Sequence, residues 1–430
     1  MGTQERNISY QVTFSLIVCL LILVYLTVSQ SYPYYFVWDM DHSVIIDILL
    51  MQSGDLPEHI VHPGFGMNIL LYFSQKIAYF LGYLSVLNFE DLSGSLNPLS
   101  GYAELAVYNR KHSAFIALGI VIMLWMSFKI LFRPPLFVSL LLLILIGCQE
   151  SLIYHSSMIR SEFYSIFFWS GSILITVLSV KYTSKIWQVT ILTTAGIFLG
   201  LCLLTKIQSG LYLVVFPIIH FLVILLGDTK GDFIINRTTK KAGIFITRLG
   251  CFTAMFFTTL LYAAQSITPP HGLWHWQHFD SINPIGMLFV LVVYTVLLFQ
   301  VFMLFKGRIN SWIFQSSYFF SLVFFGFLLS FFLHFLVYPD SLLSLKYMLL
   351  DTKMIFFKLK ASPIEEYFVK FLNNLFYDPS VFILNYFLVI IISVGYYFKF
   401  IRMKRLEVVL CLILAFFCAM NSGISSRYML

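Results

Sequence analysis

Acidic and histidine side chains gather just after the first apolar run of the chain. The sequence reads Asp39-Met40-Asp41-His42, and His62 follows a further apolar stretch. On a helix Asp39 and Asp41 would point roughly 200° apart, whereas Asp39 and His42 would share a face. A carboxylate there can serve as a general base toward a hydroxyl, or the Asp-x-Asp pair with His42 can hold a divalent cation against a phosphate. The plainest interpretation is a helix N-cap at Asp39 followed by a solvated loop.

A second polar cluster lies between two later apolar runs and contains Glu150, Arg160 and Glu162. Charged groups at a membrane boundary are costly unless paired, so an ion pair of Arg160 with Glu162 or Glu150 is one interpretation. The other interpretation has Arg160 gripping a phosphate while Glu162 orients a sugar. Lys206 ends another apolar run, where its side chain either snorkels to the interface or meets a lipid phosphate.

The composition indicates that these residues belong to a protein embedded in a lipid bilayer. Of 430 residues, 59% are hydrophobic and only 11% are charged, which is too apolar for a water-soluble domain. The formal charge of +7 is spread over short loops without a dense basic patch, so no nucleic-acid partner is expected. The six cysteines lie inside apolar runs without CxxC spacing, and no Walker A, GxGxxG, HExxH or GxSxG motif occurs. The sequence predicts an all-α, multi-pass membrane protein.

About eleven apolar runs are long enough to cross a bilayer as helices. The first follows a short polar start, lacks a small-x-small cleavage signal and is predicted to be an uncleaved signal anchor. The predicted spans are 12–28, 113–132, 135–150, 163–180, 186–204, 210–227, 242–262, 284–305, 314–337, 380–398 and 406–422.

The segment 66–87 decides the topology. If it crossed the membrane, the later basic loops would fall on the wrong side, and it contains Asn68, Gln75 and Lys76. We therefore predict a helix lying along the surface, which places most of the 27 Lys and Arg residues inside. The external segments are then 30–112, 263–283 and 338–379. We expect one membrane module over 1–262 and further transmembrane helices over 263–430.

The order of these features resembles the membrane glycosyltransferases of the GT-C fold. The shared pattern is a first span, Asp39 opening a helix, then His62-Pro63, a short surface helix and Arg110 leading into a span. Within that fold, the sequence resembles the dolichyl-phosphate-mannose protein mannosyltransferases and the bacterial aminoarabinose transferases of lipid A.

Three further segments carry the resemblance. Arg160-Ser161-Glu162-Phe163 resembles the family's second external acidic position, and the run from Gly200 to Lys206 resembles its Gly-Leu-rich segment ending in Thr-Lys. Arg427-Tyr428 resembles the start of a late Arg-Tyr motif. The likeness covers about the first 230 residues, and the rest matches by topology and that last dipeptide. The family usually continues beyond the position of Leu430, so a short tail or further residues are expected.

The resemblance implies roles for individual residues. The family's catalytic aspartate matches Asp39, but the Asp-Met-Asp run leaves the base open between Asp39 and Asp41. Glu162 would help to position donor or acceptor. The second proline of the family's His-Pro motif is replaced by Gly64. The donor phosphate would be bound by Arg160, Lys206, His62 and Arg427.

These observations predict a transferase of the bacterial plasma membrane with its active face outside. It would take a sugar from a polyprenyl-phosphate donor and pass it to a lipid, glycan or protein acceptor among the membrane lipids. A divalent cation is a cofactor only in the alternative in which the Asp-x-Asp pair binds metal. The alternative is a flippase or transporter of lipid-linked glycans. Transporters concentrate ionisable residues near the bilayer midplane, whereas here they gather at external span ends, which favours surface chemistry.

Overall fold

The computed structural model describes residues 3–33, 41–55, 57, 64–179, 185–206, 322–323, 325–334 and 336. Within these residues the regular structure is entirely helical, as the sequence predicts. The helices are α1 (Thr3–Ser29), α2 (Asp41–Ser53), α3 (Phe65–Phe80), α4 (Phe89–Gly94), α5 (Pro98–Phe132), α6 (Leu136–Gly147), α7 (Glu150–His155), α8 (Ser161–Ser179), α9 (Lys185–Thr205) and a further apolar helix, Phe325–His334.

Four of the described helices are long and apolar enough to cross a membrane. They are Tyr10–Ser29, Pro98–Phe132, Ser161–Ser179 and Trp187–Thr205. They coincide with predicted spans 12–28, 113–132, 163–180 and 186–204, and they support a membrane protein. The spans predicted at 210–227, 242–262, 284–305, 380–398 and 406–422 lie outside the described residues, as does the boundary after 262. Of the span predicted at 314–337, the helix Phe325–His334 is described.

The helix α6 is shorter than the span predicted at 135–150. Its 12 residues reach only about 18 Å, against about 30 Å of hydrocarbon. The helix ends at Gly147, whose carbonyl accepts a 2.7 Å hydrogen bond from the buried Tyr25 hydroxyl, and α7 begins at Glu150. The apolar composition of this run therefore indicates burial against α1 and α5 as much as membrane crossing.

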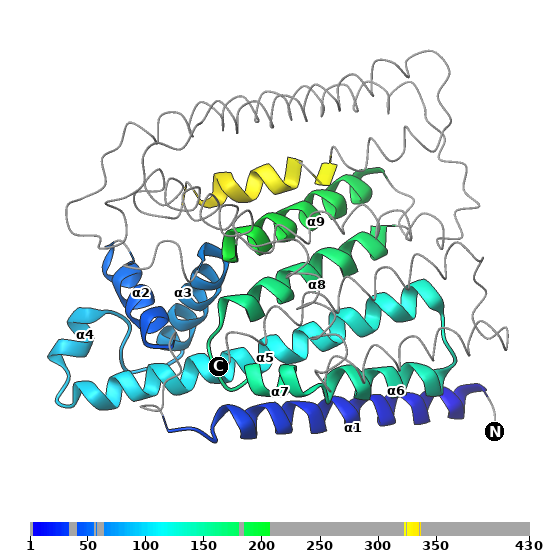
Figure 1. The fold of residues 1–430 in the computed structure, drawn as a ribbon, viewed down its shortest axis with the longest axis horizontal. Coiled ribbons are helices and arrows are strands. Elements are labelled where there is room, and N and C mark those ends of the chain that lie inside the picture. The colour runs from blue at the N-terminus through cyan, green and yellow to red at the C-terminus, as the bar shows by residue number, and fades with distance from the viewer. Residues whose placement is uncertain are drawn as a thin grey trace, which may run out of the picture.

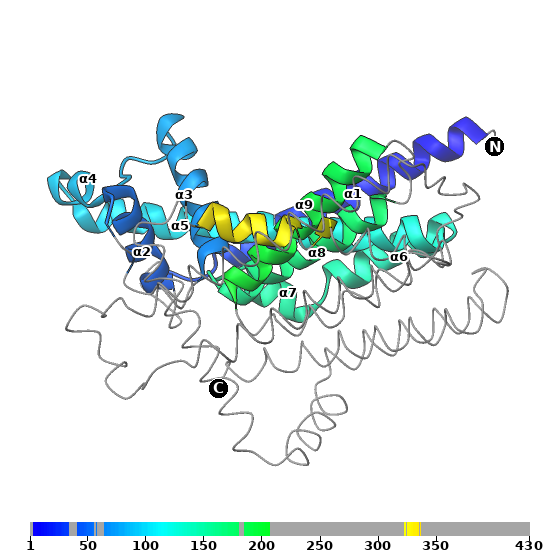
Figure 2. The same ribbon diagram turned by 90° about the horizontal axis from the view of Figure 1, so that it is seen from above.

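The described helices form a layer with a cluster at one end. In Figure 1 the candidate spans run in roughly the same direction, and α2, α3 and α4 gather at one end of them. Figure 2 shows the same grouping from above. The polar segments of the sequence thus lie together at one end of an apolar bundle.

The helix α5 connects this end to the bundle. Asn97 caps it by accepting a hydrogen bond from the Ser100 amide, and Pro98 occupies its first turn. Its 35 residues extend about 52 Å, well beyond the hydrocarbon thickness. No charged residue occurs from Ser113 to Phe128, whereas Glu104, Arg110 and Lys111 precede that stretch. The N-terminal half of α5 therefore extends past the apolar layer toward α2 to α4.

The helix α3 buries polar side chains and exposes apolar ones, the reverse of a helix on a water-soluble protein. It buries Asn68 and Gln75, and the Gln75 amide donates a 2.8 Å hydrogen bond to Asn109 of α5. Phe73, Ile77 and Phe80 are exposed by 50%, 60% and 88%. Such a helix suits a lipid interface rather than water, because the apolar side faces outward. With 16 residues it is not among the four candidate spans, and it ends before the predicted limit at 87.

Small residues let α9 approach the helix Phe325–His334 closely. Gly196 and Gly200 form a Gly-x-x-x-Gly pattern on α9. A Cβ on Gly196 would lie 1.9 Å from the Val323 carbonyl oxygen, and one on Gly326 would lie 1.9 Å from the Thr193 carbonyl oxygen. Close backbone packing of this kind is how helices associate in lipid, where burial from water supplies little.

Candidate functional site

Asp41 is a buried anchor at the start of α2. Its Oδ2 accepts a 3.1 Å hydrogen bond from the Arg110 side chain, and its Oδ1 accepts a 2.9 Å bond from the Ile159 amide. The same guanidinium donates to the carbonyls of Tyr32 and Pro33 at 2.9 and 3.1 Å. Burial raises the pKa of Asp41, while the Ile159 amide and the Arg110 charge oppose that rise. The pair therefore joins four separate segments of the chain.

Glu162 and Lys206 form the second ion pair of the described region. Glu162 lies in the first turn of α8, and Lys206 directly follows the last turn of α9. Both positions are favourable, because a helix N-terminus attracts an anion and a C-terminus attracts a cation. The contact between α8 and α9 brings these two helix ends together. The side chains of Lys206 and Glu162 remain 11% and 22% exposed, so this pair is less enclosed than Asp41–Arg110, whose side chains are each 3% exposed.

Arg160 lies between the two pairs. Its charge acts on Asp41, on His155 and on Glu162. Its Nε is buried and has no hydrogen-bond partner within the described residues. A buried hydrogen-bond donor without an acceptor is rare in folded proteins. A ligand with an oxygen acceptor would satisfy this donor.

His155 ends α7 beside this cluster. Burial lowers its pKa to about 4, with the Glu162 charge opposing and the Arg160 charge adding to the shift. Its ring stacks near Phe163 at a centroid distance of 6.1 Å. The imidazole is therefore neutral at pH 7 and leaves the positive charge of the cluster to Arg160 and Lys206.

Two glycines bring the segment after His62-Pro63 against the end of α9. A Cβ on Gly64 would lie 2.1 Å from the Thr205 carbonyl oxygen, and one on Gly66 would lie 2.2 Å from the Thr205 hydroxyl. Any larger residue would force α3 away from α9. Glycine at position 64 thus has a steric reason in this chain.

The structure brings four of the predicted site residues together, namely Asp41, Arg160, Glu162 and Lys206. Asp39, His62 and Arg427 lie outside the described residues, so their roles stay predictions. His42 turns to another side than Asp41, since its Nδ1 hydrogen-bonds with the Tyr102 hydroxyl. In the part of the chain that the structure describes, no group of three or more His, Cys, Asp or Glu residues could hold a metal.

Sequence reasoning missed the partners of these residues. One of its interpretations paired Arg160 with Glu162 or Glu150, whereas the described structure pairs Glu162 with Lys206, 44 residues away. Arg110 entered only as the residue before a span. The signal for Arg110 was available, because a guanidinium in so apolar a helix must find a carboxylate. No sequence signal indicates that the Ile159 amide completes the site of Asp41.

No protein-family model, curated protein or solved structure matches this chain. The resemblance to the GT-C family therefore rests on the residues quoted above.

Proposed function

We propose that this chain is a GT-C-like glycosyltransferase that moves a sugar from a polyprenyl-phosphate donor to an acceptor at the outer membrane face. The observation that carries the proposal is the cluster at the ends of α8 and α9. Two cations, Arg160 and Lys206, meet one partly exposed carboxylate, Glu162, and the Arg160 Nε lacks a described acceptor. A lipid phosphate supplies the oxygen acceptors that such a cluster can bind.

The cluster suits the charge change of the proposed reaction. The bond from the sugar's anomeric carbon to the phosphate oxygen breaks, and a bond from that carbon to the acceptor oxygen forms. The phosphate leaves with one additional negative charge, which Arg160 and Lys206 would stabilise more strongly than they stabilise the donor. Glu162 would hold Lys206 in place and orient the sugar.

The proton of the acceptor hydroxyl requires a base, and we propose Asp39 for this role. Both oxygens of Asp41 already accept hydrogen bonds from buried donors, Arg110 and the Ile159 amide. A carboxylate held in this way is better suited to positioning the segment before α2 than to taking a proton. Asp41 would thus fix the start of α2, two residues after the proposed base.

The test is a transfer assay with purified protein, radiolabelled polyprenyl-phosphate sugars and membrane extract. Wild-type protein should move label from the donor to a new product, and Asp39→Asn should not. A flippase would instead move intact donor across a proteoliposome without breaking the sugar–phosphate bond. Transbilayer movement of donor together with no label in any product would refute the transferase.

A further inference from the structure

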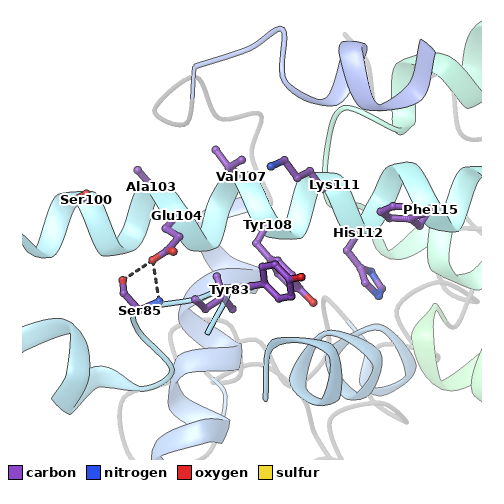
Figure 3. Close-up of a pocket in the computed structure, with 11 residues that line it drawn as sticks. Tyr83, Ser85, Ser100, Ala103, Glu104, Val107, Tyr108, Lys111, His112 and Phe115 are labelled. Atoms are coloured by element: carbon purple, nitrogen blue, oxygen red, sulfur yellow. Dashed lines mark hydrogen bonds between the residues drawn. The ribbon is translucent and has the colours of Figure 1, made fainter. Parts of the chain in front are cut away.

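An open groove runs along the N-terminal half of α5, on another side of this helix from Arg110. Its volume is about 850 Å³, within the range of small-molecule sites. Residues of α5 at helical spacing form its floor, and the loop at Tyr83 to Ser85 forms a wall. Figure 3 shows Val107 and Lys111 along one edge of α5, and Glu104, Tyr108 and His112 along the other.

The lining of the groove changes character along the helix. Ser100 and Glu104 lie at the end that extends past the apolar layer, Lys111 lies in the middle, and Phe115 lies where the uncharged stretch begins. At 1.5 Å per residue, Glu104 and Lys111 are about 10 Å apart along the axis, and Phe115 is about 6 Å beyond Lys111. The order is polar, cationic and apolar, with the apolar end toward the hydrocarbon.

Hydrogen bonds fix the polar side chains that line the groove, whereas Lys111, its cation, can bind a ligand. The Glu104 carboxylate accepts bonds from the amide and the hydroxyl of Ser85, and the Tyr108 hydroxyl donates to the Ser74 carbonyl at 2.8 Å. Lys111 is exposed and has no hydrogen-bond or ion-pair partner within the described residues. The exposed rings of Tyr83 and Phe115 add apolar surface at 73% and 52% exposure.

The groove adjoins the proposed transfer site through α5. Arg110 binds Asp41 from one side of the helix, while His112, two residues further, lines the groove. The His112 Nδ1 lies 2.9 Å from the Tyr164 hydroxyl, and the two rings stack at 5.8 Å. Tyr164 lies two residues after Glu162 in the first turn of α8. The donor phosphate has its own cations in Arg160 and Lys206, so the groove is a second site.

We propose that this groove binds the acceptor, and that the acceptor is an amphipathic membrane lipid with a phosphate headgroup. The phosphate meets Lys111, the polar head extends toward Glu104, and the chain follows Phe115 into the bilayer. The role of this lipid as the acceptor rests on the proposed function, whereas its binding to the groove does not. A soluble sugar has no apolar chain to contact the apolar end of the groove, and a protein acceptor does not need to extend into the bilayer there.

The binding test uses the full chain in phosphatidylcholine nanodiscs without any donor. An amine-reactive reagent labels exposed lysines, and mass spectrometry compares Lys111 with Lys76. Lys76 is the matched control, an exposed lysine on α3 outside the groove. Hexadecyl phosphate at about ten times its Kd should slow labelling of Lys111 roughly tenfold relative to Lys76. Inorganic phosphate and dodecyl maltoside should leave the ratio unchanged.

Three results of this test would overturn the proposal. An unchanged ratio with hexadecyl phosphate means that the groove holds no lipid phosphate. Equal protection by inorganic phosphate means a free-anion site, and equal protection by dodecyl maltoside means that the phosphate is not recognised.

A kinetic test then separates the groove from the transfer chemistry. Lys111→Gln should raise the acceptor KM about tenfold or more, because hydrogen bonds to charged groups contribute about 1.5–3 kcal/mol. Donor binding should stay unchanged, and Lys76→Gln should behave as wild type. An unchanged acceptor KM in Lys111→Gln refutes the groove as the acceptor site. Lysine protection without any transfer keeps the lipid site and refutes the transferase.

Discussion

The two ion pairs at the polar end of the molecule use the same chemistry in different surroundings. Asp41 and Arg110 are each 3% exposed. Asp41 also accepts a hydrogen bond from the Ile159 amide, and Arg110 also donates to the backbone carbonyls of Tyr32 and Pro33. Lys206 and Glu162 are 11% and 22% exposed, and they lie at two helix ends beside Arg160, whose Nε has no hydrogen-bond partner among the described residues. The first pair is closed to ligands and holds segments together. We propose that the second, open pair exchanges part of its internal contact for a substrate.

The largest effect expected from this difference is the loss of the closed pair. Asp41→Asn leaves the Arg110 charge buried without its partner, which typically costs about 3–5 kcal/mol in the free energy of unfolding. The measurement is thermal unfolding in detergent, followed by intrinsic fluorescence. Asp55→Asn is the control, since Asp55 is an exposed acid just after α2. Equal unfolding temperatures for Asp41→Asn and wild type would show that the pair does not hold the fold.

The next effect is a pH dependence that belongs to the open cluster. The pKa of His155 is lowered to about 4 in the folded protein, against 6.5 for the ordinary side chain. The unfolded chain therefore takes up the proton first, and stability should fall as the pH drops from about 6.5 toward 4. At 1.36 kcal/mol per pH unit, the loss by pH 5 is roughly 2 kcal/mol.

The His155→Gln variant provides the check on this effect. Its unfolding temperature should change less between pH 7 and pH 5 than that of the wild type, because glutamine does not titrate. Identical pH profiles for both proteins would assign the acid sensitivity to other groups.

The sequence predicted four of the described long apolar helices, but it did not predict the contacts between them. Spans such as 186–204 could be found because lipid requires about 20 apolar residues in a row. The run 135–150 looked the same, yet the chain leaves its helix at Gly147, where Tyr25 of another helix takes the carbonyl. Length and hydropathy do not encode such a distant contact.

The same limit applies to the candidate site. Arg160, Glu162 and Lys206 were found because charges in an apolar chain are rare and stand out. Their pairing was not found, because Arg160 lies close to Glu162 in sequence whereas Lys206 becomes its neighbour only when α8 packs on α9.

The smallest effect on stability is expected for the open pair. Glu162→Gln should lower the free energy of unfolding by about 1 kcal/mol, because water can solvate the ammonium of Lys206 once its carboxylate partner is removed. Donor binding should nevertheless weaken by roughly tenfold, since Lys206 loses its orientation. Thermal unfolding and binding of a radiolabelled polyprenyl-phosphate sugar are measured on one preparation. A large drop in stability with normal donor binding would make Glu162–Lys206 a second structural pair.

The most direct test of the account compares Asp39→Asn with Asp41→Asn in the transfer assay. A general base contributes about 10²–10⁴-fold to rate, so Asp39→Asn should lose that much turnover while it keeps the wild-type unfolding temperature and donor affinity. Asp41→Asn should lose stability first, and its folded fraction should keep a larger share of turnover. Full turnover in Asp39→Asn would contradict the proposed mechanism, and equal losses that a chelator reproduces in the wild type would indicate a metal bound by both carboxylates.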